Sequence, residues 1–185
     1  MKNKKIIEIE VPHNKRAEWV NGVLTLVDDI PQDVTERIKT FEDACNALGD
    51  EHPFVKEYWG MVNINLDIAQ DLIAYLKLRI ICAALNEGWE PTFDEDGLRY
   101  YLWFRIYSKS EYEKLDENKK KQCAPLRSDN NAHADGCLVY AHAYNAGSFS
   151  VTDNGVQLAF KSKELAEYAA KQFIEIYADY CFKSK

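Results

Sequence analysis

Residues 99–107 read Arg-Tyr-Tyr-Leu-Trp-Phe-Arg-Ile-Tyr, and this stretch decides the fold class. Side chains alternate between the two faces of a β-strand. One face of the predicted strand carries residues typical of a core, namely Tyr100, Leu102, Phe104 and Ile106. The other face carries a ladder of aromatic and guanidinium groups: Arg99, Tyr101, Trp103, Arg105 and Tyr107. The stretch therefore predicts the central strand of a sheet, and the ladder either packs under a helix or contacts a ligand.

Strand patterns also occur near both ends of the chain. Residues 4–28 are expected to form strands, and Asn21-Gly22, a dipeptide that tolerates the positive φ angles of a type I′ turn, predicts a β-hairpin between 17–20 and 23–27. Residues 137–144 alternate again, and 149–151 and 156–160 are shorter candidates. These later stretches supply the partners that the strand at 99–107 needs.

Helical patterns fill the region between the hairpin and the aromatic strand. Thr40 and Asp43 have the spacing of a capping box and predict a helix that ends near Gly49. A second helix is expected to begin near His52-Pro53. The longest predicted helix covers 66–86. Its apolar stripe comprises Ala69, Leu72, Ile73, Leu76, Ile80 and Ala83.

Two more helices are predicted in the C-terminal half. Ser110 and Glu113 mark the start of a short polar helix that continues to Lys121. Ser162 is expected to cap one long C-terminal helix. The core face of that helix comprises Leu165, Ala169, Phe173, Ile176 and Tyr180.

The order of these elements indicates an α+β fold. Strands and helices are segregated instead of alternating as βαβ units, which favours a mainly antiparallel sheet. We expect an N-terminal β-hairpin and helical segment, followed by the sheet and a long C-terminal helix. At 185 residues and 46% hydrophobic content, the chain is predicted to form a single domain, 1–185, with 1–88 and 89–185 as possible subdomains.

Charge and cysteine content narrow the function classes. Lys and Arg total 23 against 30 Asp and Glu, and the net charge of −7 works against a sequence-independent grip on phosphates. The N-terminus lacks the long apolar region of a signal peptide. The five cysteines are odd in number and widely spaced, so we expect reduced thiols and a cytoplasmic protein without membrane contact.

The sequence offers little support for a metal site or a catalytic site. Cys123, His133, Cys137 and His142 are zinc-ligand types, but they form no compact ligand pairs. The chain contains neither a G-x-S-x-G motif nor a phosphate-binding P-loop. We therefore predict no metal site, no cofactor and no catalytic residue.

Several segments of the sequence together resemble those of one protein family. They read Trp19-Val-Asn-Gly-Val-Leu-Thr-Leu-Val27, Glu36-Arg-Ile-Lys-Thr-Phe-Glu-Asp-Ala-Cys45, Asn86-Glu-Gly-Trp-Glu-Pro91, Leu158-Ala-Phe-Lys-Ser-Lys-Glu-Leu-Ala-Glu-Tyr168 and Lys171-Gln-Phe173. Over nearly its whole length the chain is similar to uncharacterised proteins of gut Bacteroidetes, their phages and their mobile elements. The resemblance implies a phage or mobile-element setting, with a phage particle as an alternative to the cytoplasm, and it implies no activity, ligand or site residue.

A second candidate surface lies in residues 128–154, which are rich in Asn, Ser, Asp, Tyr, His and Gly. Antibody loops use much of this palette, because Tyr supplies rigid contact area and Ser and Asn supply adaptable hydrogen bonds. Tyr140, His142 and Tyr144 are expected on one strand face, and Phe149 follows them. The alternative is a polar loop followed by an ordinary edge strand.

The leading functional hypothesis is a non-enzymatic binding or interaction protein of phage or mobile-element origin, with an unknown protein or small molecule as partner. A homo-oligomer is compatible with this hypothesis. The predicted binding residues are Tyr140, His142, Tyr144, Phe149, Trp103, Arg99 and Arg105. One alternative is a single-stranded nucleic-acid-binding protein that uses Arg99, Trp103, Arg105 and the 119–121 lysines, although the acidic net charge counts against it. An enzyme of unidentified class is the third.

Overall fold

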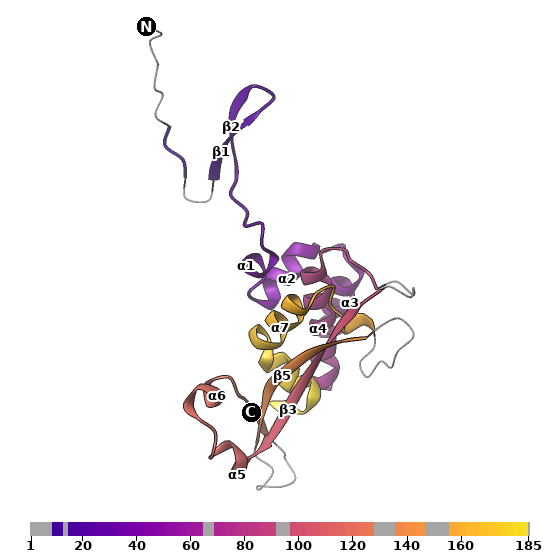
Figure 1. Cartoon of the computed structure of the whole chain (residues 1–185). Coiled ribbons are helices and arrows are strands. Elements are labelled where there is room, and N and C mark those ends of the chain that lie inside the picture. Colours follow the sequence, from indigo (N-terminus) through magenta and orange to yellow (C-terminus); the bar gives the residue numbers. More distant parts are fainter. Residues whose placement is uncertain are drawn as a thin grey trace. The chain divides into compact units, whose positions relative to one another are not determined.

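The computed structural model describes residues 9–12, 15–64, 69–91, 97–127, 136–146 and 156–184. The chain divides into two compact units, Met1–Arg37 and Ile38–Lys185. Helices and antiparallel strands occur along the chain, which confirms the predicted α+β class (Figure 1). None of the helices within these described ranges is long and apolar enough to cross a membrane.

The smaller unit contains the predicted hairpin. Strands β1 (Lys15–Val20) and β2 (Val23–Asp28) pair from Lys15 opposite Asp28 to Val20 opposite Val23. Asn21 and Gly22 have φ angles of 51° and 80°, as a type I′ turn requires. Residues 9–12 lie outside both strands, so the strand expected there is wrong, whereas the hairpin strands are slightly longer than the predicted 17–20 and 23–27. Helix α1 (Val34–Arg37) follows.

Helices α2 (Phe41–Leu48) and α3 (Pro53–Asn63) begin where predicted. The Thr40 hydroxyl accepts a hydrogen bond from the Asp43 backbone N–H at 3.0 Å, and the Asp43 carboxylate accepts one from the Thr40 N–H at 2.9 Å. This reciprocal pair confirms the capping box. Gly49 ends α2 with a φ of 83°.

Helix α4 (Gln70–Asn86) is the central helix of the larger unit. It contacts α2, α3, α7 and α8, which we define below. The predicted stripe is wrong at Leu72, which is 39% exposed, whereas Leu78, Ile81 and Leu85 outside that stripe are buried. Because several elements surround the C-terminal half of α4, that half is buried on more sides than a single stripe allows.

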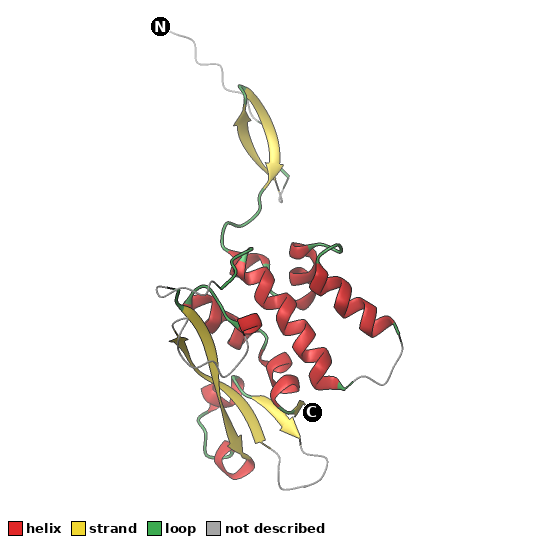
Figure 2. Ribbon diagram, turned by 90° about the vertical axis from the view of Figure 1, so that its right-hand side faces the viewer, coloured by secondary structure: helices red, strands yellow, loops and turns green. Residues whose placement is uncertain are grey.

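A four-stranded antiparallel sheet forms the other layer of the larger unit (Figure 2). Its strands are β3 (Arg99–Ser108), β4 (Ala124–Arg127), β5 (Gly136–Ala146) and β6 (Lys183–Ser184), in the order β3-β5-β4-β6. The aromatic strand β3 is therefore at the end of this order and not at its centre, contrary to prediction. Beyond β3 there is an isolated bridge between Tyr100 and Phe160.

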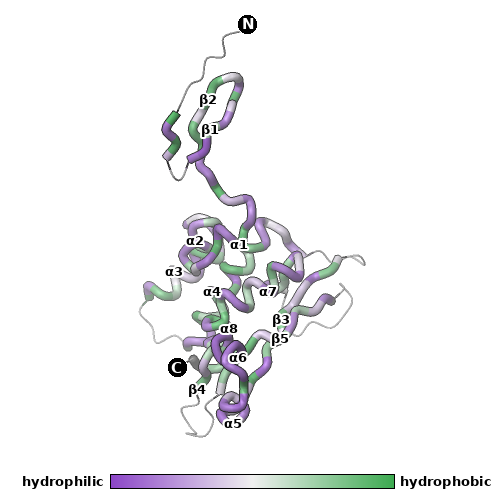
Figure 3. The backbone as a smooth tube through the Cα atoms, turned by 60° about the vertical axis from the view of Figure 1, so that its left-hand side comes forward, coloured by the Kyte–Doolittle hydropathy of each residue, from purple (hydrophilic) through white to green (hydrophobic). Residues whose placement is uncertain are grey.

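The connection between β3 and β4 holds two short helices, α5 (Lys109–Tyr112) and α6 (Glu117–Lys121). The predicted cap at Ser110 is wrong, because the Ser108 hydroxyl accepts from the Glu111 N–H and the Glu111 carboxylate accepts from the Ser108 N–H. Asp116 caps α6 separately. Figure 3 shows α6 in the purple of hydrophilic residues, and none of its residues is buried.

The C-terminal helix is a pair and not one helix. Ser162 caps α7 (Lys163–Gln172) as predicted, and a break at Phe173 starts α8 (Ile174–Cys181). The break turns the core face, so Tyr177 and Ala178 are the buried residues of α8. The strand predicted over 156–160 is a 3₁₀ turn, η1 (Val156–Leu158), followed by the bridge at Phe160.

A buried polar group joins α4 to this bridge. The Asn86 amide nitrogen donates to the Ala159 carbonyl oxygen at 2.8 Å, and its amide oxygen accepts from the Lys161 N–H at 3.0 Å. The Cys82 thiol also donates to the Ala159 carbonyl, at 3.0 Å. Helix α4 thus holds the backbone on both sides of Phe160, which pairs with β3 through Tyr100.

Candidate functional site

The pairing of β3 with β5 decides which side chains share a face. Tyr101 lies opposite Tyr144 and Trp103 opposite His142, but Phe104 lies opposite Tyr140. Ala141 has no partner in this ladder, so β5 has a β-bulge at that residue. The bulge shifts the alternation by one residue.

This shift corrects the predicted surface. His142 and Tyr144 point to the face of Trp103, whereas Tyr140 points to the face of Phe104. Tyr140, His142 and Tyr144 therefore do not share a face, because regular alternation ends at the bulge. Phe149 lies outside the described residues.

Four rings gather on one face of the β3–β5 pair, and we call them the aromatic cluster: Tyr101, Trp103, His142 and Tyr144. The Trp103 and His142 rings are stacked, with centroids 5.8 Å apart and planes 16° apart. Tyr144 meets Trp103 edge-on at 6.2 Å and Tyr101 at 5.7 Å. Such pairs contribute about 0.5–1.5 kcal/mol each beyond the burial of area. The contacts hold the rings in fixed orientations.

Exposure changes sharply across the aromatic cluster. Tyr101 is 1% exposed and packs against Ala159, whereas Trp103 is 50% exposed and His142 is also exposed. The cluster is therefore anchored in the core at Tyr101 and open to solvent at Trp103. Its open end exposes aromatic rings that are held in place by one another, and Trp103 also lines the cavity beside α8 that is described below.

The two arginines of the ladder have different surroundings. Arg99 is buried, with 9% of its surface exposed, so it does not extend the open end of the cluster. Arg105 is exposed, and its guanidinium carbon lies 4.8 Å from the centroid of the Tyr107 ring. The ladder thus offers one exposed guanidinium beside Trp103, and not the two that the sequence suggested.

Tyr140 belongs to the interface between the sheet and α7. The Lys171 ammonium lies 5.3 Å from the centroid of its ring. Burial, and then the nearby Glu167 carboxylate, raise the pKa of Tyr140. The ring lines a small cavity of about 240 Å³ together with Cys123 and Ile174. Tyr140 is a packing residue here and is not part of the aromatic cluster.

A larger, mostly apolar cavity of about 300 Å³ lies between the sheet and α8. Phe104 and Ile106 line it from β3, and Tyr177 and Cys181 line it from α8. Burial raises the pKa of Tyr177 and the pKa of the Cys181 thiol, so both groups hold their protons at neutral pH. This cavity can accept an apolar group, but neither titratable side chain is tuned for proton transfer near pH 7.

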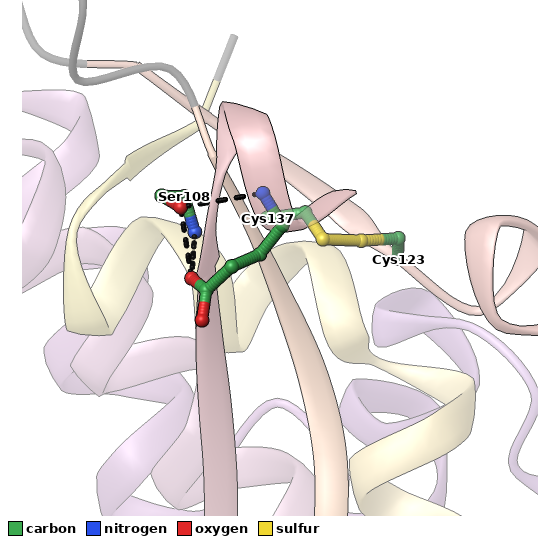
Figure 4. Close-up of a disulfide and its surroundings, with 4 residues drawn as sticks. Ser108, Cys123 and Cys137 are labelled. Atoms are coloured by element: carbon green, nitrogen blue, oxygen red, sulfur yellow. Dashed lines mark hydrogen bonds between the residues drawn. A yellow bond between two sulfur atoms is a disulfide. The ribbon is translucent and has the colours of Figure 1, made fainter. Parts of the chain in front are cut away.

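A disulfide joins Cys123 to Cys137 across β4 and β5, with Cα atoms 5.6 Å apart (Figure 4). The expectation that all five cysteines are reduced is therefore wrong for this pair. Pro125 lies opposite Cys137 in the ladder, and this pairing brings Cys123 close although the sequence separates the two by 14 residues. Cys45, Cys82 and Cys181 are free thiols.

The disulfide also bears on metal and nucleophile chemistry. Two of the four candidate zinc ligands, Cys123 and Cys137, are bonded to each other, and His133 lies outside the described residues. Among the residues that the structure describes, no group of three or more His, Cys, Asp or Glu side chains could hold a metal ion. We take the aromatic cluster as the candidate site.

The stacking of Trp103 on His142 was missed by the sequence analysis, which placed the two residues on separate candidate surfaces. The alternating aromatic residues of 99–107 and 137–144 were the available pattern, but joining them needs the register. Comparison with protein-family models, curated proteins and solved structures gave no significant match to this chain. The chemistry of the site therefore rests on its own geometry.

Proposed function

We propose that this chain is a non-enzymatic binding protein whose contact surface is the open end of the aromatic cluster. The observation that carries the proposal is the Trp103 ring, half-exposed and stacked on the exposed His142 ring. Trp and Tyr dominate the binding energy of many interfaces. Rings already held by stacking lose little side-chain entropy on binding, so ordering them takes little away from the binding free energy.

The surface fits a partner that presents an apolar or planar group. The exposed rings offer area and edges, the His142 imidazole offers a hydrogen bond, and Arg105 adds one positive charge. A protein or small-molecule partner with an aromatic or aliphatic group and an acceptor nearby would use all three. The family resemblance adds a phage or mobile-element setting to this proposal.

A peptide-display experiment tests the proposal without a known partner. Random peptides are selected on the immobilised wild-type protein, and the recovered peptides are measured against Trp103→Ala and Trp59→Ala. Trp59 is a matched control, because it is 45% exposed on α3, away from the sheet. We expect Trp103→Ala to weaken binding at least about tenfold and Trp59→Ala to leave it unchanged. Binders that ignore Trp103 would refute the assignment of this surface.

Single-stranded nucleic-acid binding is the second candidate, and the stacked Trp103–His142 pair is the feature that favours it. Nucleic-acid bases stack on aromatic side chains with about 1–3 kcal/mol per base. The burial of Arg99 and the net charge of −7 weigh against it. Fluorescence anisotropy with a labelled oligo-dT, at low and at moderate salt, separates the candidates, because a nucleic-acid site must bind at low salt and lose affinity as salt rises.

A further inference from the structure

The N-terminal hairpin exposes an unusual amount of apolar side chain. On one face Trp19 is 71% exposed, with Leu24 at 38% and Leu26 at 44%. On the opposite face Val20 is 43% and Val23 is 64% exposed. A two-stranded hairpin alone is marginally stable in water, and at least a third strand or a covering layer is needed. Within the described residues, no further strand pairs with either edge of the hairpin.

The two edges of the hairpin differ in how well they would accept another strand. Strand β1 carries Lys15, Arg16 and Glu18, and charged side chains are a common protection against edge pairing. Strand β2 reads Val-Leu-Thr-Leu-Val over residues 23–27, without a charge or a proline. Its only charged residue, Asp28, lies at the end and is paired with Lys15. The β2 edge is the one open to pairing.

We infer that β2 pairs antiparallel with β2 of a second copy of this chain, and the four strands form one sheet in the order β1-β2-β2-β1. The two-fold axis of this homodimer passes through Thr25. Leu24 then lies opposite the partner's Leu26, and Val23 opposite the partner's Val27. Every pair beside the axis is apolar, and no like charges meet. The surface lies in the smaller unit, so the inference is independent of the aromatic cluster.

Backbone geometry favours this register. Val20 and Val23 close the two-residue turn, and hydrogen-bonded and non-hydrogen-bonded pairs alternate from there. The N–H and C=O groups of Leu24 and Leu26 therefore point away from β1, and an axis at Thr25 brings them against the same groups of the partner. A slip by one residue would place the leucine face of one copy against the valine face of the other.

The surface area that the homodimer buries indicates how tightly it binds. Edge pairing buries the backbone edge of β2 and leaves both faces of the hairpin in solvent, so the area buried is smaller than the exposed apolar area of the two hairpins. Specific interfaces begin near about 1,000 Å², and the smallest are weak. A homodimer that dissociates on dilution is the expected behaviour.

The test measures the mass of the full chain by light scattering or sedimentation over about two decades of concentration. We expect the wild type to shift from monomer to dimer, and a monomer throughout would overturn the inference. The decisive variant is Thr25→Lys. Within the hairpin the new lysine faces Glu18, which favours the hairpin, but at the axis it meets the same lysine of the other copy. It should remain monomeric, and a dimer equal to wild type would refute the register.

Two controls separate edge pairing from other modes. Ala17→Lys places a charge on the apolar face of β1, away from the proposed axis, and should still dimerise. If Ala17→Lys is the monomer and Thr25→Lys the dimer, the faces pack together and the proposed edge pairing is wrong. Leu24→Lys and Leu26→Glu should each dimerise poorly alone and form a mixed dimer together, because the lysine of one copy then faces the glutamate of the other. Failure of the mixture would contradict the axis at Thr25.

Discussion

Asn86→Ala removes the group by which α4 holds the Phe160 bridge. Asn86 is 4% exposed, and its two shortest hydrogen bonds, of 2.8 and 3.0 Å, both go to backbone atoms. Each such bond contributes about 1 kcal/mol net, and a stranded backbone group adds about 1–3 kcal/mol of desolvation. The Ala159 carbonyl still accepts a hydrogen bond from the Cys82 thiol, so most of the destabilisation comes from the Lys161 N–H, which loses its acceptor. We expect a decrease of about 2–4 kcal/mol in the free energy of unfolding.

Denaturant unfolding of the full chain, followed by circular dichroism, measures this change. Asn46→Ala is the matched control, because Asn46 is an exposed residue of α2 and alanine suits a helix interior. Cys82→Ala provides a second check, since it should be more damaging in the Asn86→Ala background, where the Ala159 carbonyl loses its last donor. If Asn86→Ala unfolds within about 0.5 kcal/mol of wild type, the buried amide does not stabilise the bridge and the reasoning fails.

Three further predictions concern the disulfide, a cap and the free thiols. Reduction of Cys123–Cys137 should lower the free energy of unfolding by about 3 kcal/mol, because the bridge closes a loop with a 14-residue separation, and equal unfolding curves with and without reductant would contradict this. The Lys39 backbone N–H and then the Thr40 hydroxyl hold the pKa of Asp43 below its usual value, so its stabilisation is complete above about pH 5 and is lost as the pH falls through the lowered pKa. The difference in unfolding free energy between wild type and Asp43→Asn should therefore shrink on acidification, and a difference independent of pH would argue against the cap. Cys181 is exposed as a residue although its thiol is partly desolvated at the cavity, so under native conditions it should react with a thiol reagent before the fully buried Cys82, and the reverse order would contradict the packing of α4.

The features predicted correctly are those that neighbouring residues determine. The Asn21-Gly22 turn, the reciprocal cap at Thr40 and the cap at Ser162 each depend on backbone angles and hydrogen bonds within a few residues. The strand at 99–107 was found for a similar reason, because alternation is a local pattern. These elements were enough for the α+β class.

The features that were missed depend on contacts between distant segments. The place of β3 in the sheet depends on where β5 pairs, and nothing within residues 99–107 indicates how many strands pair with β3 or which ones. The Cys123–Cys137 disulfide appears only when β4 lies beside β5. The break at Phe173 divides a helix whose propensity is continuous, so tertiary packing decides it.

The candidate site was half predicted. Trp103, His142 and Tyr144 were named from the sequence, but Tyr140 was grouped with them because regular alternation requires it. One unpaired residue, Ala141, was enough to separate Tyr140 from the others. A short sequence motif does not predict such a bulge, because the extra residue can be identified only from the pairing with the opposite strand.

The bulge at Ala141 has a consequence for how much change this strand tolerates. If Ala141 were deleted, Tyr140 and His142 would become neighbours in a regular strand, and neighbours point to opposite faces. Both faces of β5 would keep the side chains that they have now. A chain without Ala141 is therefore expected to keep the same aromatic cluster. Ala141 acts as a single-residue insertion that leaves the other side chains of β5 on their present faces.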